Sequence, residues 1–173
     1  MFESCSALTS ITLSSLNTVV PQCCFMDCKN LTTINLDNVT TFESQCFSGC
    51  SNLTTINLSS GVTVIPNACF RGCSNLTSIN LSNITVFNDN CLKDCSSLTV
   101  SDINWTNVTR IGGGAFGKVH IQQQNLVIPN LTFLGGWVFG NDDSSGITSI
   151  DFTGSTFTNI YAGFVEGHRS LIM

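Results

Sequence analysis

Charged residues are scarce in this sequence, and their scarcity limits what the protein can bind. Asp, Glu, Lys and Arg make up 10% of the 173 residues, and the formal net charge is -5 at pH 7. The six basic residues form no stripe; they are Lys29, Arg71, Lys93, Arg110, Lys118 and Arg169. Because nucleic-acid affinity depends mainly on neutralising phosphate charge, we expect no nucleic-acid binding.

Long apolar runs are also missing. No stretch of about twenty apolar residues occurs, so the sequence predicts no membrane insertion. The start, Met1-Phe2-Glu3-Ser4-Cys5, lacks the basic and apolar regions that are typical of a signal peptide. These residues do not predict the cellular compartment, since the targeting segment of a longer exported protein can lie outside the given sequence.

The motifs that most enzymes need are absent as well. The sequence has no glycine-rich phosphate loop, no nucleophile elbow and no paired carboxylates at a repeated inward position. The glycines at 112–114 stand directly before Ala115-Phe116, where a repeat unit turns, which predicts a structural role for them. We therefore expect a protein that is not an enzyme, with no catalytic residue and no cofactor.

The main signal that the sequence does contain is a repeat of 22 to 24 residues. Four windows begin at Leu8, Leu31, Leu53 and Leu76 and read LTSITL, LTTINL, LTTINL and LTSINL. Each window is followed by a second apolar segment and then by a closing unit; these units are CFMDC (24–28), CFSGC (46–50), CFRGC (69–73) and CLKDC (91–95). A period of this size is typical of leucine-rich repeats.

The apolar pattern within each window predicts a half-buried strand. Leucine, isoleucine and leucine occupy the first, fourth and sixth positions, and threonine, serine and asparagine lie between them. One unit cannot bury its apolar side alone, so we expect the units to stack at a strand spacing of about 4.8 Å. The predicted fold is a β-rich solenoid of about seven rungs, with a parallel sheet on one side and short helical or 3₁₀ turns.

After Cys95 the repeat becomes irregular but continues. We predict one domain over 1–173, with regular rungs over 5–95 and irregular rungs over 96–173. The apolar spacing aligns Val100, Ile103 and Trp105 with Leu76, Ile79 and Leu81. The polar segment 140–146 predicts a protruding loop before the last rung.

With these motifs laid out, the chain resembles the BspA-type leucine-rich repeat family. The segment CSNLTTINLSSGVTVIPNACFRGC (50–73) fits the family pattern throughout, and VTRIGGGAF (108–116) fits its closing half. Where the family usually has alanine before phenylalanine, four units here have cysteine, at Cys24, Cys46, Cys69 and Cys91. The resemblance implies a cell-surface or extracellular bacterial or protist protein that adheres to host or matrix proteins, although a fold of this type hosts many functions.

Ten cysteines allow a packing, a disulfide and a metal interpretation. We favour packing, because later rungs carry apolar residues at the same positions, namely Ala115, Val119, Val138 and Phe164. That replacement argues against a metal site, which needs a constant set of ligands. Disulfides between adjacent rungs stay open, since the strand spacing lies near the lower limit for bridged Cα atoms. Cys23 is expected to point outward and is the candidate for a reactive thiol.

Eight Asn-x-Ser/Thr sequons and one acidic loop invite modification and ion-binding interpretations. The sequons are at Asn30, Asn38, Asn52, Asn75, Asn83, Asn104, Asn107 and Asn130. Because the repeat itself places asparagine before Leu-Thr, glycosylation is the less favoured interpretation. Asp142 and Asp143 lie in a Ser/Gly-rich loop, where solvated carboxylates are more common than a calcium site. We expect no metal.

The outward strand positions form the candidate recognition face, which consists of Thr33, Asn35, Thr55, Asn57, Ser78 and Asn80. The face has few aromatic residues or arginines, so we expect polar contacts with a protein partner or matrix component. Trp137 and Tyr161 are candidate contacts in the irregular half, because departures from a repeat often mark function. In the alternative, structural interpretation, Trp105 replaces a core leucine and Trp137 fills a turn.

Two functions fit these observations. The first is a non-catalytic protein-binding or adhesion module; the alternative is a structural subunit of a larger assembly, such as a surface appendage or phage virion fibre. Both ends of the sequence match incomplete rungs without polar caps. Uncapped rungs predict end-to-end self-association, a larger assembly or a longer array.

Overall fold

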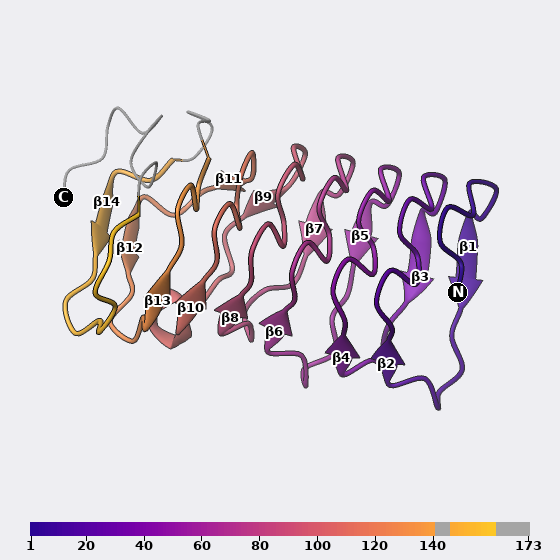
Figure 1. Cartoon of the computed structure of the whole chain (residues 1–173), viewed down its shortest axis with the longest axis horizontal. Coiled ribbons are helices and arrows are strands. Elements are labelled where there is room, and N and C mark those ends of the chain that lie inside the picture. Colours follow the sequence, from indigo (N-terminus) through magenta and orange to yellow (C-terminus); the bar gives the residue numbers. More distant parts are fainter. Residues whose placement is uncertain (141–145, 162–173) are drawn as a thin grey trace.

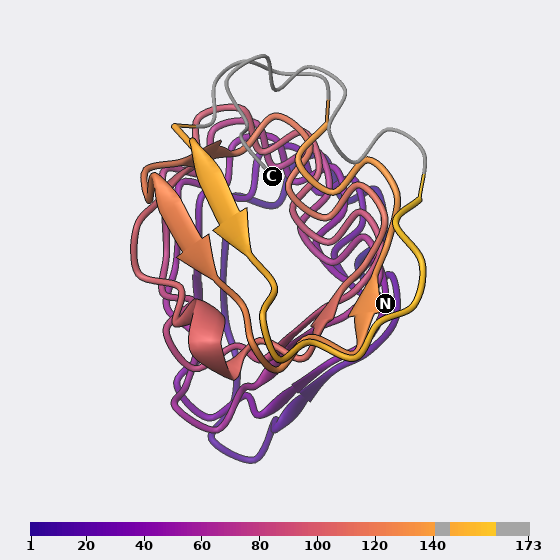
Figure 2. The same cartoon turned by 90° about the vertical axis from the view of Figure 1, so that its left-hand side faces the viewer.

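The computed structural model describes residues 1–140 and 146–161 and forms a parallel β-solenoid of about six turns (Figure 1). Successive rungs lie side by side along the long axis, and Figure 2, which looks along that axis, shows them superimposed around a common interior. The expected solenoid is confirmed. Part of the expected seventh rung, with Phe164, lies outside the described residues, as do Asp142 and Asp143 of the predicted loop.

The leucine-rich windows form the first row of strands. This row contains β1 (Ser10–Thr12), β3 (Thr33–Asn35), β5 (Thr55–Ile56), β7 (Ser78–Ile79), β9 (Thr99–Val100), β11 (His120–Ile121), β12 (Asn125–Val127) and β14 (Ser149–Asp151). The pairs β1–β3, β5–β7, β9–β11 and β12–β14 are parallel and in register, with Thr55 opposite Ser78, for example. The predicted parallel sheet is therefore confirmed on this side.

The second apolar segment of each repeat also forms a strand. These strands are β2 (Val19–Val20), β4 (Thr41–Phe42), β6 (Val64–Ile65), β8 (Val86–Phe87), β10 (Arg110–Ile111) and β13 (Phe133–Leu134). β2 pairs with β4, and β6, β8, β10 and β13 form a four-stranded parallel sheet. In each of these strands the first residue faces out and the second is buried, which explains the spacing of the apolar pairs.

Each closing unit is a series of tight turns. Its backbone N–H groups donate alternately to the next rung and to a carbonyl of the same rung. In the unit 68–73, every second N–H group donates to the next rung at 2.8 to 2.9 Å; the pairs are Ala68 to Asp89, Phe70 to Cys91 and Gly72 to Lys93. The intervening N–H groups close tight turns by donating to the carbonyl three residues earlier, as Arg71 does to Ala68. Positive φ angles recur every fourth residue, as at Ala68 (+49°) and Gly72 (+73°), and they prevent a continuous helix. Among the described residues, the only 3₁₀ helix is η1 (Trp105–Asn107).

The first irregular rung differs from the expected alignment by two residues. Asp102 accepts the N–H of Leu81 in the way that Asn80 accepts the N–H of Leu58, so Ile103 is the equivalent of Leu81. The structure places Trp105 in an insertion that forms η1, not at the position of a strand leucine. Its ring is nevertheless buried, at 5% exposure, so its core role is confirmed.

Two ladders of side chains fill the interior behind the closing units. Phe2, Phe25, Phe47 and Phe70 stack with ring centroids 5.3 to 5.5 Å apart. Cysteines make the second ladder; Cys28, Cys50, Cys73 and Cys95 are fully buried. The core of the described residues contains no buried polar or charged side chain. The stacking therefore buries the repeated apolar positions in one continuous core, as each rung requires.

Candidate binding surfaces

All six residues of the candidate recognition face are exposed, and they come from the first row of strands. Thr33 and Asn35 lie in β3, Thr55 lies in β5 and Ser78 lies in β7, while Asn57 and Asn80 directly follow their strands. The structure therefore brings these residues to one side of the solenoid. Whether they contact a partner stays a prediction.

Two amides of this face are already used inside the protein. Asn80 accepts the N–H of Leu58 at 2.6 Å and donates to the carbonyl of Leu58 at 3.0 Å, bridging two rungs where strand pairing has ended. Asn35 accepts the N–H of Asp37 at 2.8 Å, which closes a turn at the end of β3. A partner that binds this face therefore contacts mainly the hydroxyl groups and the Asn57 side chain.

A shallow hollow of about 440 Å³ marks the face at the first rungs. It is lined by residues of β1 and β3 and reaches Asn57, which follows β5. Its outer walls include Thr12, Thr33 and Asp37. Hydroxyl, amide and carboxylate groups therefore surround a surface large enough for one side chain of a partner.

A second hollow, in the irregular half, joins the two aromatic residues that the sequence singled out. Trp137 and Tyr161 both line it, and their side chains are 43% and 47% exposed. Tyr161 lies against Phe133 with ring centroids 6.4 Å apart, and the guanidinium of Arg110 stacks on Phe133 at 3.8 Å. Trp137 therefore occupies a turn, as the structural interpretation expected, but its ring is available to a ligand.

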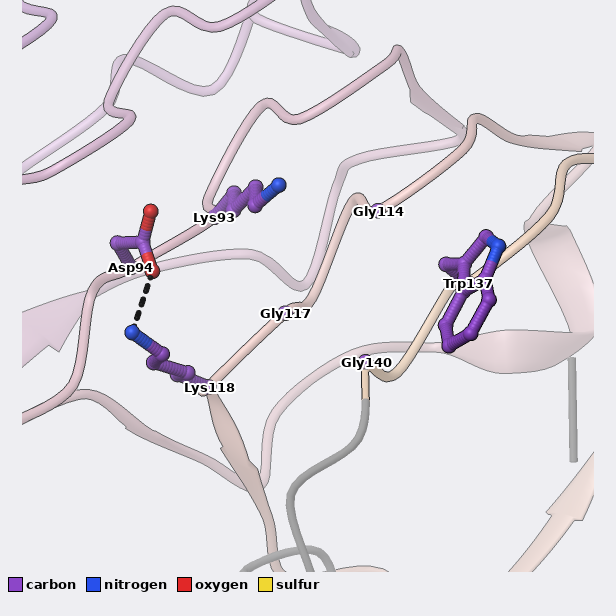
Figure 3. Close-up of a pocket in the computed structure, with 7 residues that line it drawn as sticks. All are labelled: Lys93, Asp94, Gly114, Gly117, Lys118, Trp137 and Gly140. Carbon is purple, nitrogen blue, oxygen red and sulfur yellow. Dashed lines mark ion pairs between the residues drawn. The ribbon is translucent and has the colours of Figure 1, made fainter. Parts of the chain in front are cut away.

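Lys93 and Trp137 stand on either side of a glycine floor in this region (Figure 3). Gly114 and Gly117 form the floor of a hollow of about 380 Å³, which adjoins the Tyr161 side through shared residues. Lys118 pairs with Asp94 at 3.0 Å at the edge. We call the two adjoining parts together the aromatic hollow.

Close backbone contact explains part of the glycine run, as the sequence predicted. A Cβ atom at Gly112 would lie 2.5 Å from backbone atoms of Asn88 and Asp89, which no side chain tolerates. A Cβ atom at Gly135 would overlap the backbone nitrogen of Gly113 in the preceding rung. The backbones of consecutive rungs therefore leave no room for a Cβ atom at these two positions.

Sequence reasoning missed Lys93, Gly114 and Gly117 as parts of a surface. The signal was present: Gly114 and Gly117 replace residues such as Asn90 and Lys93, which occupy the same positions one rung earlier. Two glycines at outward positions remove side chains from a surface that is otherwise covered. The inward positions of the repeat alignment give the core, and its outward positions show where surface side chains are missing.

The buried cysteines act as hydrogen-bond donors and packing groups. Each thiol of the second ladder donates to the phenylalanine carbonyl of the preceding rung, for example Cys50 to Phe25 at 3.0 Å and Cys73 to Phe47 at 3.2 Å. Burial raises the pKa of Cys50 to about 12. A protonated, buried thiol is a poor nucleophile and a poor metal ligand, which supports the packing interpretation.

All ten cysteines are free thiols in the structure. Cys46 and Cys69 lie in adjacent rungs, and their thiols form a hydrogen bond with the sulfur atoms 3.3 Å apart. Cys23 is partly exposed, and its sulfur lies 3.5 Å from the side-chain oxygen of Gln45. Cys5 is more exposed than Cys23, which sequence reasoning did not foresee.

Three of the sequon asparagines form a ladder of side-chain amides. The amide of Asn52 donates to Asn30 and that of Asn75 donates to Asn52, both at 3.2 Å, while Asn30 donates to the carbonyl of Ser6 at 2.7 Å. This amide ladder links four rungs along the turn before the strands. Attaching a glycan to one of these nitrogens would replace one of its two hydrogens and place a sugar beside the neighbouring rungs, which counts against glycosylation there.

Neither a metal cluster nor a membrane span is found in the described part of the chain. Over 1–140 and 146–161, no group of three or more His, Cys, Asp or Glu side chains is arranged to hold a metal ion. Within the same residues, no helix has the length and apolar content needed to cross a bilayer.

Parallel rungs with inward leucine and isoleucine, closed by tight turns, define a leucine-rich-repeat solenoid. Residues 1–122 match the BspA type leucine-rich repeat region in six copies, and the chain belongs to this family. No curated protein matches the sequence. The resemblance inferred from the repeat motifs is thereby confirmed.

Two solved structures of leucine-rich repeat proteins share the fold. One is a leucine rich cell surface protein from Faecalibacterium prausnitzii A2-165, with a TM-score of 0.60 and 18% identity, covering 95% of this chain and 60% of that protein. The other is a leucine rich repeat protein from T. pallidum, with a TM-score of 0.60 and 23% identity, covering 83% of this chain and 72% of that protein. The chain thus spans about 60% of the length of the Faecalibacterium protein.

Proposed function

We propose that the protein is a non-catalytic binding module that contacts a protein or matrix component through its recognition face. The observation that carries the proposal is the alignment of exposed hydroxyl groups on adjacent strands, with Thr55 directly opposite Ser78. Such a surface offers many weak polar contacts in fixed register and no charge that would repel a partner. Membership of a repeat family that generally serves as a scaffold, and the name of the Faecalibacterium cell surface protein, support the proposal.

The size of a stable interface sets the extent of the contact. A specific protein interface buries about 800 Å² on each partner, roughly a tenth of the 8031 Å² of accessible surface here. The six named residues cover only three rungs, so the contact extends over neighbouring rungs, including the hollow beside β1 and β3. Trp137 and Tyr161 lie in the irregular half and are not required for this contact.

A matched pair of arginine substitutions tests the proposal. Thr55→Arg places a large charged side chain in the recognition face, and Thr41→Arg places the same side chain at an exposed position of the second sheet. Binding to immobilised fibronectin, laminin and collagen is measured by surface plasmon resonance. We expect Thr55→Arg to weaken binding at least about tenfold and Thr41→Arg to leave it unchanged. Equal binding by both variants would contradict the assignment of this face.

The second candidate function is a subunit of a larger assembly. The first rung leaves Phe2 41% exposed although its ring stacks on Phe25, and a hollow of about 300 Å³ lies beside them. A second copy that stacks on this rung would continue the phenylalanine ladder. Light scattering over a range of concentrations tests this alternative, since self-association through the rung must increase with concentration and must fall in Phe2→Ser. A molar mass that stays monomeric throughout would exclude it.

A further inference from the structure

The aromatic hollow contains groups that neither the fold nor the recognition face requires. Gly117 occupies the position that carries Ser48, Arg71 and Lys93 in the preceding rungs, as the repeated backbone bonds establish. Gly114 likewise replaces Asn90. The fifth rung therefore presents backbone where earlier rungs present side chains, and the surface sinks between its two neighbours.

The side chain of Lys93 lies across this floor. Its stem passes close to both glycines; a Cβ atom built on Gly117 would lie 3.3 Å from its Cγ, and one on Gly114 would lie 3.8 Å from its Cδ. Figure 3 shows the amino group directed away from Asp94. Over the described residues, the only ion pair joins Asp94 to Lys118, so the Lys93 ammonium has no carboxylate partner.

A backbone donor in the same hollow is also without a partner. Asp89 and Gly113 occupy equivalent positions, and each donates its N–H to a side chain of the preceding rung: Asp89 to Asn67 at 3.2 Å and Gly113 to Asp89 at 2.9 Å. Gly136 is next in this series, but the residue that would accept its N–H is Gly113, which has no side chain. Within the described part of the chain, the N–H of Gly136 has no acceptor.

These groups together make an anion-accepting surface beside exposed aromatic rings. Three of the six basic residues, Lys93, Arg110 and Lys118, lie along this side, against two carboxylates in the lining, Asp89 and Asp94, which leaves one positive charge in excess. The ammonium of Lys93 and the N–H of Gly136 both suit a carboxylate. The indole of Trp137 and the phenol of Tyr161 provide flat apolar surfaces next to them.

We propose that the aromatic hollow binds a carboxylated pyranose unit of a glycan. The apolar C–H face of the sugar ring lies on Trp137, and its carboxylate lies between Lys93 and Gly136. Its hydroxyl groups pair with Asp89 and Asn90, which line the same hollow. This binding is separate from the protein contact proposed above.

The shape of the hollow favours a sugar over a peptide. Peptides gain specificity from enclosed pockets for side chains or from pairing with a free strand edge. Here the floor is glycine backbone, and the apolar area is the flat face of two rings. A volume of about 380 Å³ beside Trp137 lies in the usual range of small-ligand sites, roughly 300 to 1,000 Å³.

The carboxylate can come from a uronic acid or from a sialic acid, and the experiment distinguishes the two. The probes are methyl glucuronide, methyl glucoside, the methyl glycoside of N-acetylneuraminic acid, and the blocked dipeptide Glu-Glu. Titrations are followed by calorimetry and by tryptophan fluorescence. Only Trp105 and Trp137 contribute to the fluorescence, and Trp105 is buried, so a change on binding reports Trp137.

We expect one carboxylated sugar to bind at least about tenfold more tightly than methyl glucoside. The tighter of the two carboxylated sugars identifies the source. Lys93→Gln should reduce its affinity to that of the glucoside, whereas Lys93→Arg should retain it. Trp137→Ala should weaken both sugars about tenfold, and Val64→Ala, an exposed position of the second sheet, should change neither.

Three results would overturn the proposal. One is no binding of either carboxylated sugar up to about 20 mM, a range in which even weak sites are detected. Another is unchanged binding by Lys93→Gln. The third is tighter binding of the dipeptide than of both sugars. Lys93→Gln removes the charge of this half-buried side chain and Lys93→Arg retains it, so this pair decides the outcome even if Trp137→Ala fails to fold.

Discussion

Replacing Phe47 by alanine tests whether the phenylalanine ladder holds the rungs together. Phe47 is fully buried, and its ring stacks on Phe25 at 5.3 Å and on Phe70 at 5.5 Å, almost parallel to both. Truncating a buried phenylalanine costs about 3–5 kcal/mol of the free energy of unfolding. Loss of two stacked pairs, each worth roughly 0.5–1.5 kcal/mol beyond its area, puts Phe47→Ala in the upper part of that range.

The chain supplies its own control for this substitution. Leu92 occupies the position of Phe47 two rungs later, where it is fully buried below Phe116. Phe47→Leu therefore keeps a side chain that the ladder already accepts, and we expect it to cost only about 1–2 kcal/mol.

Urea unfolding followed by circular dichroism and by tryptophan fluorescence measures both values. With a slope of about 2 kcal/mol per molar urea, Phe47→Ala should lower the midpoint by about 2 M and Phe47→Leu by less than 1 M. Coincident curves from the two probes are needed, because long repeat arrays can lose two-state behaviour. Equal midpoints for the two variants would refute the reasoning, since the ladder would then contribute no more than ordinary apolar contact.

Three further predictions concern stability. Because burial raises the pKa of Cys50 and of Cys95 to about 12, the folded state keeps these protons when the unfolded state loses them near pH 9. The free energy of unfolding should fall between pH 9 and 12, by about 1.4 kcal/mol per pH unit for each thiol, and urea titrations of Cys95→Ala should show a shallower fall. Gly135→Ala should destabilise strongly, since its Cβ would overlap backbone, while Gly61→Ala, whose Cβ would lie 3.6 Å from a Thr40 methyl, should change the melting temperature little. Asn80→Ala removes both bonds to Leu58 and should cost about 1–3 kcal/mol in urea unfolding, whereas Asn57→Ala, at the equivalent position one rung earlier, should cost less than about 0.5 kcal/mol.

The regular half of the fold could be predicted because its apolar positions repeat without interruption. Leu53, Ile56 and Leu58 are buried and Thr55 and Asn57 are exposed, as strand alternation requires. The insertion at Trp105 was harder to find, because a buried tryptophan fits a core position in either alignment. The bonds that the N–H groups of Leu81 and Leu58 donate to Asp102 and Asn80 fix which residue replaces which leucine.

The closing units were only partly predictable. Their cysteine and phenylalanine spacing gave the buried positions, but it is compatible with a short helix as well as with a chain of turns. The difference lies in the backbone, where Ala68 and Gly72 adopt positive φ and alternate N–H groups leave the unit for the next rung. Alanine has no intrinsic preference for that conformation, so the stacked neighbour decides it.

The surfaces were predictable only where they follow the repeat. The recognition face comes from the same alternation as the core, so its six residues were found together. Trp137 and Tyr161 were singled out as departures from the repeat, but their meeting in one hollow depends on how the last described rungs stack. Lys93 belongs to a regular rung, and its role beside Trp137 arises from the missing side chains of Gly114 and Gly117.

The alternating turns give the solenoid a direction. In the closing units from 23 to 116 the outgoing N–H groups point toward the following rung, so within these units the side facing the following rung offers donors and the side facing the preceding rung offers carbonyl acceptors. Two rungs can therefore join only head to tail, never head to head. Evolution can lengthen or shorten such a protein by whole repeats without leaving a mismatched seam, because each duplicated rung arrives with the same polarity as its neighbours.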